Sequence, residues 1–135
     1  MKYIISYVAT AIVFFGLDFL WLSRISTSFY KTHLQDLLLD QPNLGIAALF
    51  YIFYVGGIVY FCVLPALAAG SWQQALFSGA LLGLIAYGTY DITNLSTLKN
   101  WSVIVSVVDI VWGAFLTGLS ALAGFWIATK ITPQL

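Results

Sequence analysis

Three aspartates stand out in this sequence because the stretches around them are otherwise almost free of charge. They are Asp18, Asp91 and Asp109. A charge at the centre of a membrane-spanning helix costs about 2.5–3.5 kcal/mol on insertion scales, so such residues usually face the interior of a helix bundle and mark a site. Carboxylates gathered in a low dielectric cannot all stay ionised. They would share protons, bind a cation, or pair with Arg24 or Lys99 from the membrane interface.

The residues near these aspartates are rich in aromatic and hydrogen-bonding groups. Tyr87 and Asn94 stand four residues before and three residues after Asp91, which places the three on one helix face. The other two aspartates are each followed, three residues later, by a tryptophan. Two tyrosines of a further apolar segment complete the predicted binding set, which consists of Asp18, Asp91, Asp109, Asn94, Tyr51, Tyr54, Tyr87, Trp21 and Trp112. We expect these side chains to form a polar pocket inside the membrane.

The residue types limit the chemistry of this pocket without assigning a reaction. Oxygen ligands alone suit Mg²⁺, Ca²⁺ or Na⁺ rather than zinc. The single cysteine, Cys62, excludes a disulfide within the chain and a cysteine metal site. His33 is expected to lie at the membrane interface rather than to bind a metal, and we predict no metal site. No nucleophile elbow or phosphate-binding loop is present, so catalytic residues and a cofactor stay unassigned.

The composition requires a membrane around this chain. Of its 135 residues, 61% are hydrophobic and 7% are charged, whereas a soluble domain carries about 25% charged residues. So few charges cannot cover a surface that faces water, and we therefore expect membrane lipids to be the main partners. The five basic residues are scattered and the net charge is zero, which excludes the clustered basic patch that nucleic-acid binding needs.

The apolar stretches predict an all-α fold, a four-helix bundle that spans the membrane as one domain. A hydrocarbon core of about 30 Å requires about 20 helical residues. Stretches of this length lie at about residues 3–23, 44–67, 72–95 and 101–129. The first is longer than the apolar region of a signal peptide, so we interpret it as a retained span. Four spans place both chain ends on one side of the membrane, although the scattered basic residues do not decide which side.

The connection between the first two spans has room for a helix at about residues 26–39. Its apolar residues recur at helical spacing and are Tyr30, Leu34, Leu37 and Leu38, whereas its polar residues Lys31, Gln35 and Asp36 fall elsewhere. We expect an amphipathic helix in the plane of the interface, over the mouth of the pocket. Counted from the ends of their spans, the three aspartates lie roughly 7–12 Å below this same interface.

Several motifs of the chain resemble those of a known protein family. They are Tyr87-Gly88-Thr89-Tyr90-Asp91-Ile92-Thr93-Asn94, Thr97-Leu98, Trp101, Asp109-x-x-Trp112-Gly113, Asp18-x-x-Trp21-Leu22 and Ala48-Leu49-Phe50-Tyr51. The chain is similar over nearly its whole length to a small family of bacterial inner-membrane proteins known only as a domain of unknown function. This resemblance implies four helices and a multi-pass protein of the bacterial cytoplasmic membrane. It implies no activity and no ligand.

The leading hypothesis is a membrane-embedded binding protein whose pocket holds a small polar group, a cation or a lipid head group. One alternative is an enzyme of lipid modification, with one protonated aspartate as general acid and another as base. Another is a small carrier linked to protons or ions, which would act as a homo-oligomer because four helices make a small transporter. A third is a structural subunit of a membrane assembly, in which each aspartate only ties helices together.

Overall fold

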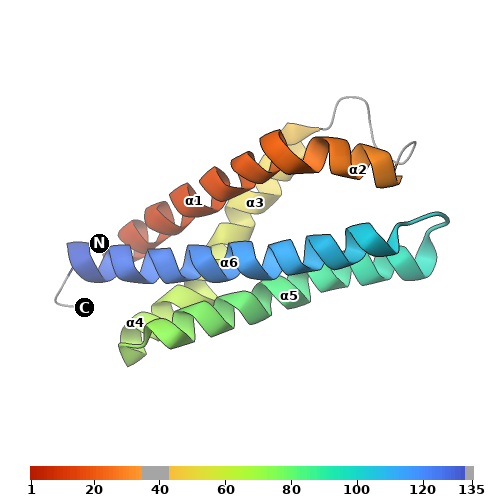
Figure 1. The fold of residues 1–135 in the computed structure, drawn as a ribbon. Helices are drawn as coiled ribbons and strands as arrows, with labels where there is room; N and C mark the ends of the chain where they lie inside the picture. The colour runs from red at the N-terminus through yellow and green to blue at the C-terminus, as the bar shows by residue number, and fades with distance from the viewer. Residues whose placement is uncertain (35–42, 133–135) are drawn as a thin grey trace.

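The structure is a computed structural model that describes residues 1–34 and 43–132, without the side chains of residues 25–27. Helices follow one another along almost the whole of this part of the chain (Figure 1). They are α1 (Lys2–Trp21), the π-helix η1 (Leu22–Ser26), α2 (Thr27–Leu34), α3 (Leu44–Ile58), the π-helix η3 (Val59–Val63), α4 (Leu64–Ala69), α5 (Trp72–Thr97) and α6 (Val103–Ile131). The prediction of an all-α protein is confirmed.

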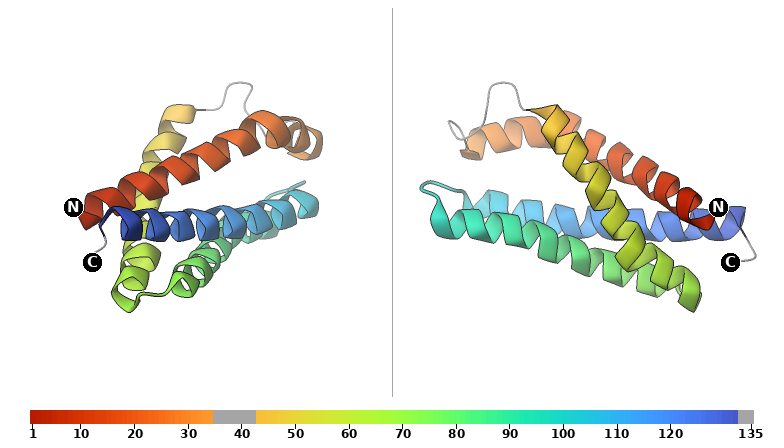
Figure 2. Two further views of the ribbon diagram at one scale, coloured as in Figure 1. Left: turned by 60° about the vertical axis from the view of Figure 1, so that its left-hand side comes forward. Right: turned by 180° about the vertical axis from the view of Figure 1, so that it is seen from behind.

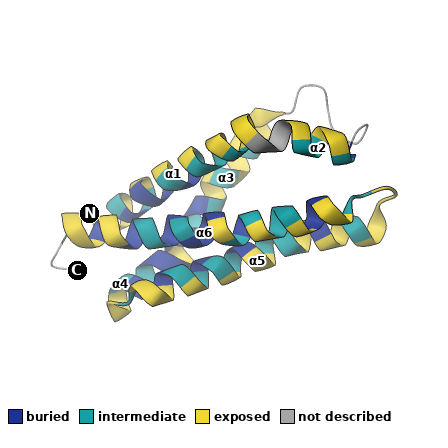
Figure 3. Cartoon of the chain, viewed as in Figure 1, coloured by how far each residue is buried: buried dark blue, intermediate teal, exposed yellow. Residues whose placement is uncertain are grey.

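Four of the helical stretches are long and apolar enough to cross a membrane, as the sequence predicts. They are Lys2–Arg24, Leu44–Ala69, Trp72–Thr97 and Val103–Ile131. Large apolar side chains cover their outer faces, with Phe53 76% exposed and Leu49 72% exposed. The exposed faces lie outside and the buried faces point into the bundle (Figure 3). An exterior of this kind is stable only in contact with lipid.

Capping side chains begin three of the helices, and tight turns join the last three spans. The side chains of Asn43, Ser71 and Ser102 accept hydrogen bonds from backbone N–H groups of the first helical turns that follow them, each at 3.1 Å. Between α4 and α5, Gly70 takes a left-handed conformation with φ of 65°, which ends α4 and reverses the chain. Asn100 takes a similar conformation between α5 and α6. Because of these two tight turns, each of the last two spans runs antiparallel to the span before it.

The four spans form a bundle that is tighter on one side than on the other. Helices α5 and α6 pack together along their length, and α1 lies along α6. The span made by α3, η3 and α4 instead crosses the bundle obliquely, as the view from behind shows (Figure 2). The start of α1 and the end of α6 lie at the same end of the bundle as the turn at Gly70, and the turn between α5 and α6 lies at the opposite end (Figure 1). We call these the terminal side and the loop side.

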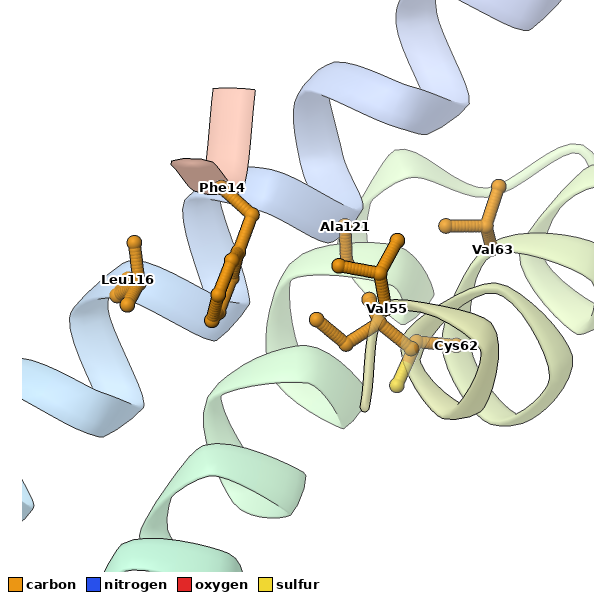
Figure 4. Close-up of a cluster of buried hydrophobic side chains, with 7 residues drawn as sticks. Phe14, Val55, Cys62, Val63, Leu116 and Ala121 are labelled. Carbon is orange, nitrogen blue, oxygen red and sulfur yellow. The ribbon is translucent and has the colours of Figure 1, made fainter. Parts of the chain in front are cut away.

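The apolar core lies where the oblique span crosses α1 and α6 (Figure 4). Its buried members are Phe14, Val55, Ile58, Cys62, Val63, Leu116 and Ala121. Phe14 is the largest of these side chains, and its ring lies 5.6 Å from the rings of both Tyr51 and Tyr54. The core therefore fills the middle of the bundle, and the aspartates of α1, α5 and α6 come together on the loop side of it.

The first span continues into the connecting helix without a break. The helix that begins at Lys2 passes through η1 into α2 and reaches Leu34, whereas the sequence predicts the span to end at residue 23. No glycine or proline occurs between residues 17 and 34, so nothing in this part of the sequence interrupts the helix. Within the predicted helix at 26–39, residues 27–34 are helical, Leu34 is buried and Lys31 is exposed. Residues 35–39 lie outside the described part of the chain.

Candidate functional site

Asp109 lies at the centre of a group of carboxylates on the loop side of the bundle. Its carboxyl group lies near enough to that of Asp91 on α5 for the two to interact electrostatically, although no hydrogen bond of standard geometry joins them. It also lies within electrostatic range of Asp18 on α1. We call these three residues the carboxylate cluster. The helices α1, α5 and α6 each contribute one member, because α6 packs between the other two.

Asp91 is the most deeply buried member of the carboxylate cluster. Its side chain is 0% exposed, and neither of its oxygens has a hydrogen-bond partner within the described part of the structure. An isolated ionised carboxylate in such a place is very costly unless it is paired or neutralised. Asp91 therefore needs either a proton or a positively charged partner.

Two tryptophans form the wall of the cluster between α1 and α6. The indole rings of Trp21 and Trp112 stack with 4.5 Å between centroids and 10° between planes. The carboxyl group of Asp18 lies against the indole of Trp112, although the Trp112 Nε1 atom is buried without a hydrogen bond of standard geometry. Each Asp-x-x-Trp motif thus contributes to the surroundings of the other.

Tyr30 of α2 covers the cluster from the loop side. Its hydroxyl group donates a hydrogen bond to Asp109 Oδ1 at 2.9 Å and accepts one from Trp21 Nε1 at 3.3 Å. Burial, followed by the nearby Asp109 carboxylate, raises the pKa of the Tyr30 phenol, so this group remains a donor. The sequence analysis assigned Tyr30 to the apolar face of the connecting helix and missed it as a site residue. A tyrosine on the inward face of a helix predicted to cover the pocket was the available signal.

Tyr51 and Tyr87 lie next to the cluster on its membrane-centre side. Tyr51 lies within electrostatic range of Asp18 and Asp109, and its side chain interacts with that of Tyr87. The Tyr87 ring packs over Gly113, where an added Cβ would collide with it. The absence of a side chain at Gly113 thus positions an aromatic ring of α5 one helical turn from the Asp109 carboxylate on α6.

Two members of the predicted set lie at the margins of this arrangement. Tyr54 lies deeper, where its hydroxyl group shares a hydrogen bond with Thr117 Oγ1 at 2.9 Å and its ring lies 6.3 Å from that of Tyr87. Asn94 interacts with Tyr90, which is 57% exposed, rather than with Asp91. The structure thus brings seven of the nine predicted residues into one group and places Tyr54 and Asn94 beside it.

The cluster has no basic side chain against it in the described part of the protein. Arg24 and Lys99 are exposed, and neither contributes to the interactions of Asp18 or Asp91. Among the described residues, no three histidine, cysteine, aspartate or glutamate side chains are placed so that they could hold a metal ion. The site thus consists of three acidic side chains with aromatic rings beside them.

Comparison with known proteins identifies a family. Residues 3–126 match the model of a family described as "Predicted membrane protein (DUF2177)", and the chain belongs to this family. The family resemblance predicted from the sequence motifs is therefore confirmed. No curated protein and no solved structure matches the chain.

Proposed function

We propose that this membrane protein of the DUF2177 family binds the ammonium group of a small organic cation or of a lipid head group. The binding residues would be the carboxylate cluster together with the aromatic side chains around it. The sequence allows three ligand classes, namely a small polar group, a cation and a lipid head group. Within these classes, the residues of the site favour a ligand that carries a positive charge.

The unpaired carboxyl group of Asp91 is the observation that carries this proposal. It is fully buried, it has no hydrogen-bond partner in the described structure, and it lies directly beside a second carboxylate, Asp109. Removal of two carboxylates from water is favourable only when positive charge or protons compensate them. An ammonium group supplies the charge, and its N–H groups supply the hydrogen bonds that the Asp91 oxygens lack.

The aromatic wall favours an organic cation over a metal ion. An ammonium group is attracted to the faces of tryptophan and tyrosine rings within about 6 Å, by about 0.5–2 kcal/mol for each interaction. Trp21, Trp112, Tyr51 and Tyr87 all lie around the cluster. A hard metal ion would gain little from such rings and prefers six or more oxygen ligands, which three carboxylates on separate helices supply poorly.

The site would receive its ligand from the loop side. Tyr30 occupies the space above Asp109, and the hydrogen bond between them would have to break before a cation reaches the carboxylate. The five-residue π-helix η1 connects α2 to the first span, and π-turns within α-helices are frequent at functional sites. We infer that α2 acts as a cover for the site. From the family resemblance we also infer the bacterial cytoplasmic membrane as its location.

A binding experiment with matched probes tests the proposal. Trp21 and Trp112 are left as the only fluorescent indoles by replacing the other three tryptophans, Trp72, Trp101 and Trp126, with phenylalanine. Choline and ethylammonium should change their emission with saturation, whereas 3,3-dimethyl-1-butanol, which has the shape of choline without its charge, should not. The change should disappear in Asp91→Asn and persist in Ser96→Ala, a substitution on the same helix at a hydroxyl that bonds to its own backbone.

Equal responses to the charged and neutral probes, or a response that persists without Asp91, would overturn the proposal. The source of the ammonium group is decided by a second comparison. Nanodiscs of phosphatidylethanolamine should occupy the site and weaken the choline response if the ligand is a lipid, and nanodiscs of phosphatidylglycerol should leave it unchanged. Native mass spectrometry of the protein extracted with its lipids would identify the bound molecule.

A further inference from the structure

Many serine and threonine hydroxyl groups in and next to these helices donate to the helix backbone one turn earlier. Eight of them bond to the carbonyl oxygen four residues earlier, and they are Thr32, Ser78, Thr89, Ser96, Thr97, Ser106, Thr129 and Thr132. This bond is the ordinary way to satisfy a hydroxyl group in a helix that faces lipid or packed side chains. It leaves no free hydrogen-bonding capacity for a ligand on the donor side.

Three hydroxyl groups between α1 and α6 depart from this pattern. Ser6, Thr10 and Ser120 are each 0% exposed, and their side-chain oxygens have no hydrogen-bond partner within the described residues. Thr10 packs against Gly124, where an added Cβ would collide with its hydroxyl oxygen. Since Ser120 is one helical turn from Gly124, the Ser120 and Thr10 hydroxyl groups lie on the facing sides of the two helices. Buried hydroxyl groups without partners each cost about 1–3 kcal/mol.

These hydroxyl groups continue towards the carboxylate cluster through two further residues. Thr117, one turn from Ser120 on α6, shares a hydrogen bond of 2.9 Å with the hydroxyl group of Tyr54. The Tyr54 ring lies 6.3 Å from that of Tyr87. Tyr87 in turn interacts with Tyr51, which lies within electrostatic range of Asp18 and Asp109. We call Ser6, Thr10, Ser120, Thr117 and Tyr54 the hydroxyl row.

The apolar core determines the course of the hydroxyl row. Along α1, Phe14 stands one helical turn from Thr10 and one from Asp18, and its fully buried ring belongs to the apolar core (Figure 4). The polar groups at this level that belong to α6 are Ser120 and Thr117. The row therefore runs from Ser6, one turn from the start of α1 on the terminal side, to the tyrosines beside the cluster.

We propose that the hydroxyl row holds internal water molecules and conducts protons between the terminal side of the membrane and the carboxylate cluster. Hydroxyl groups one helical turn apart are separated by about 5.4 Å. One water molecule with hydrogen bonds of about 2.8 Å to each neighbour spans that distance, and buried water needs two to four polar partners of this kind. A proton enters from water at Ser6, each oxygen accepts one proton and releases another, and a carboxylate of the cluster becomes a carboxylic acid. No oxidant or reductant takes part.

The unpaired state of the row distinguishes a proton path from polar contacts that hold helices together. The Tyr54–Thr117 pair has the direct hydrogen bond expected of a structural contact. Ser6, Thr10 and Ser120 have none, and as contacts between α1 and α6 they would contribute nothing that alanine or valine would not. Their free donors and acceptors are useful only to a bound molecule.

Infrared spectroscopy of the carboxyl groups tests this inference without any added ligand. After transfer of the protein in nanodiscs from H₂O to D₂O, the C=O band of protonated carboxyl groups moves as deuterium replaces hydrogen. We expect this exchange to slow at least tenfold when Thr10→Val and Ser120→Ala are combined, because these substitutions interrupt the chain of internal water molecules. Thr129→Val and Ser96→Ala, whose hydroxyl groups bond to their own backbone, should exchange at the wild-type rate.

Equal exchange rates in the row variant and the controls would overturn the inference. So would a large fall in melting temperature with unchanged exchange, because that result would make the row a structural contact. The row variants are nearly isosteric and remove hydroxyl groups without partners, so we expect the protein to fold with its melting temperature preserved. The proton path can fail while the cluster still binds a cation, and cation binding can fail while the exchange still slows.

Discussion

The stacked indole rings of Trp21 and Trp112 join two copies of the same short motif on antiparallel helices. Each tryptophan follows an aspartate by three residues, and the rings lie 4.5 Å apart. Stacked aromatic pairs contribute about 0.5–1.5 kcal/mol beyond the burial of their surface. This contact holds α1 against α6 on the loop side, and it fixes the aromatic wall beside which the carboxylates lie.

Asp91→Asn is expected to stabilise the protein. The substitution replaces a fully buried carboxyl group that has no hydrogen-bond partner with a neutral group of the same shape that can donate to Asp109. We expect the free energy of unfolding in detergent to rise by about 1 kcal/mol, since removal of an uncompensated buried charge is favourable. A gain in stability with a loss of cation binding is typical of functional sites. A loss of stability similar to that of a core substitution would indicate that Asp91 only holds helices together.

The three carboxylates should respond to one another in double-mutant cycles. Asp109 lies near Asp91 and within electrostatic range of Asp18, so its replacement by asparagine should change the effect of replacing either residue. Residues in contact show interaction energies of about 0.5–3 kcal/mol, whereas distant sites are additive. Unfolding free energies of the single and double asparagine variants provide the measurement. Additive losses for all pairs would mean three separate polar contacts and no shared site.

Tyr30→Phe should loosen the cover without changing the spans. The variant loses the hydrogen bonds to Asp109 and Trp21, and a hydrogen bond to a charged group contributes about 1.5–3 kcal/mol. In a background of Cys62→Ala, we expect a cysteine introduced by Leu34→Cys to react faster with a water-soluble maleimide when Tyr30 is replaced. Thr32→Val is the matched control, because the Thr32 hydroxyl group bonds to the backbone of its own helix. An unchanged rate in Tyr30→Phe would show that this tyrosine does not hold α2 in place.

Gly113→Ala should destabilise the protein, whereas Gly88→Ala should not. A Cβ at Gly113 would collide with the Tyr87 ring, and one at Gly88 would meet nothing within 4 Å. Overpacking costs about 1–3 kcal/mol, and alanine in place of glycine at an open helical position is favourable by about 0.5–1 kcal/mol. Melting temperatures of the two variants measure the difference. If both behaved alike, the close packing of α5 on α6 would be wrong.

The topology gives a further test that does not depend on the site. Reporter fusions at Gly70 and after the last residue should locate to one side of the membrane, and a fusion at Lys99 to the other. This follows from the four spans and the tight turn at each end of α5. A fusion at Lys99 on the same side as the C-terminal fusion would contradict it.

The spans were predictable because hydrophobic length is a local property of the sequence. The common level of Asp18, Asp91 and Asp109 could also be estimated, since helical rise converts residue number into depth. The role of Tyr30 could not, because the sequence contains no signal for how the helix turns through η1 before α2 packs on the bundle. The pairing of Asn94 with Tyr90 could not be predicted either, because Tyr90 and Asp91 stand four and three residues before Asn94 and helical spacing brings both within its reach.

The glycines of α5 and α6 have a consequence for how the molecule could move. Gly79 and Gly83 lie so close to α6 that an added Cβ at either would collide with its backbone. Two helices in backbone contact cannot slide or rotate past each other without a large steric cost. Helices α5 and α6 therefore form a rigid pair. The oblique span and the long arm from Lys2 to Leu34 meet the glycines of α6 through side chains, such as that of Thr10 at Gly124, rather than through backbone, and both contribute to the core around Phe14. Outward displacement of α2 would therefore tilt α1 about its core contact at Phe14. This tilt would shift Ser6 and Thr10 relative to Ser120 on the opposite side of the membrane.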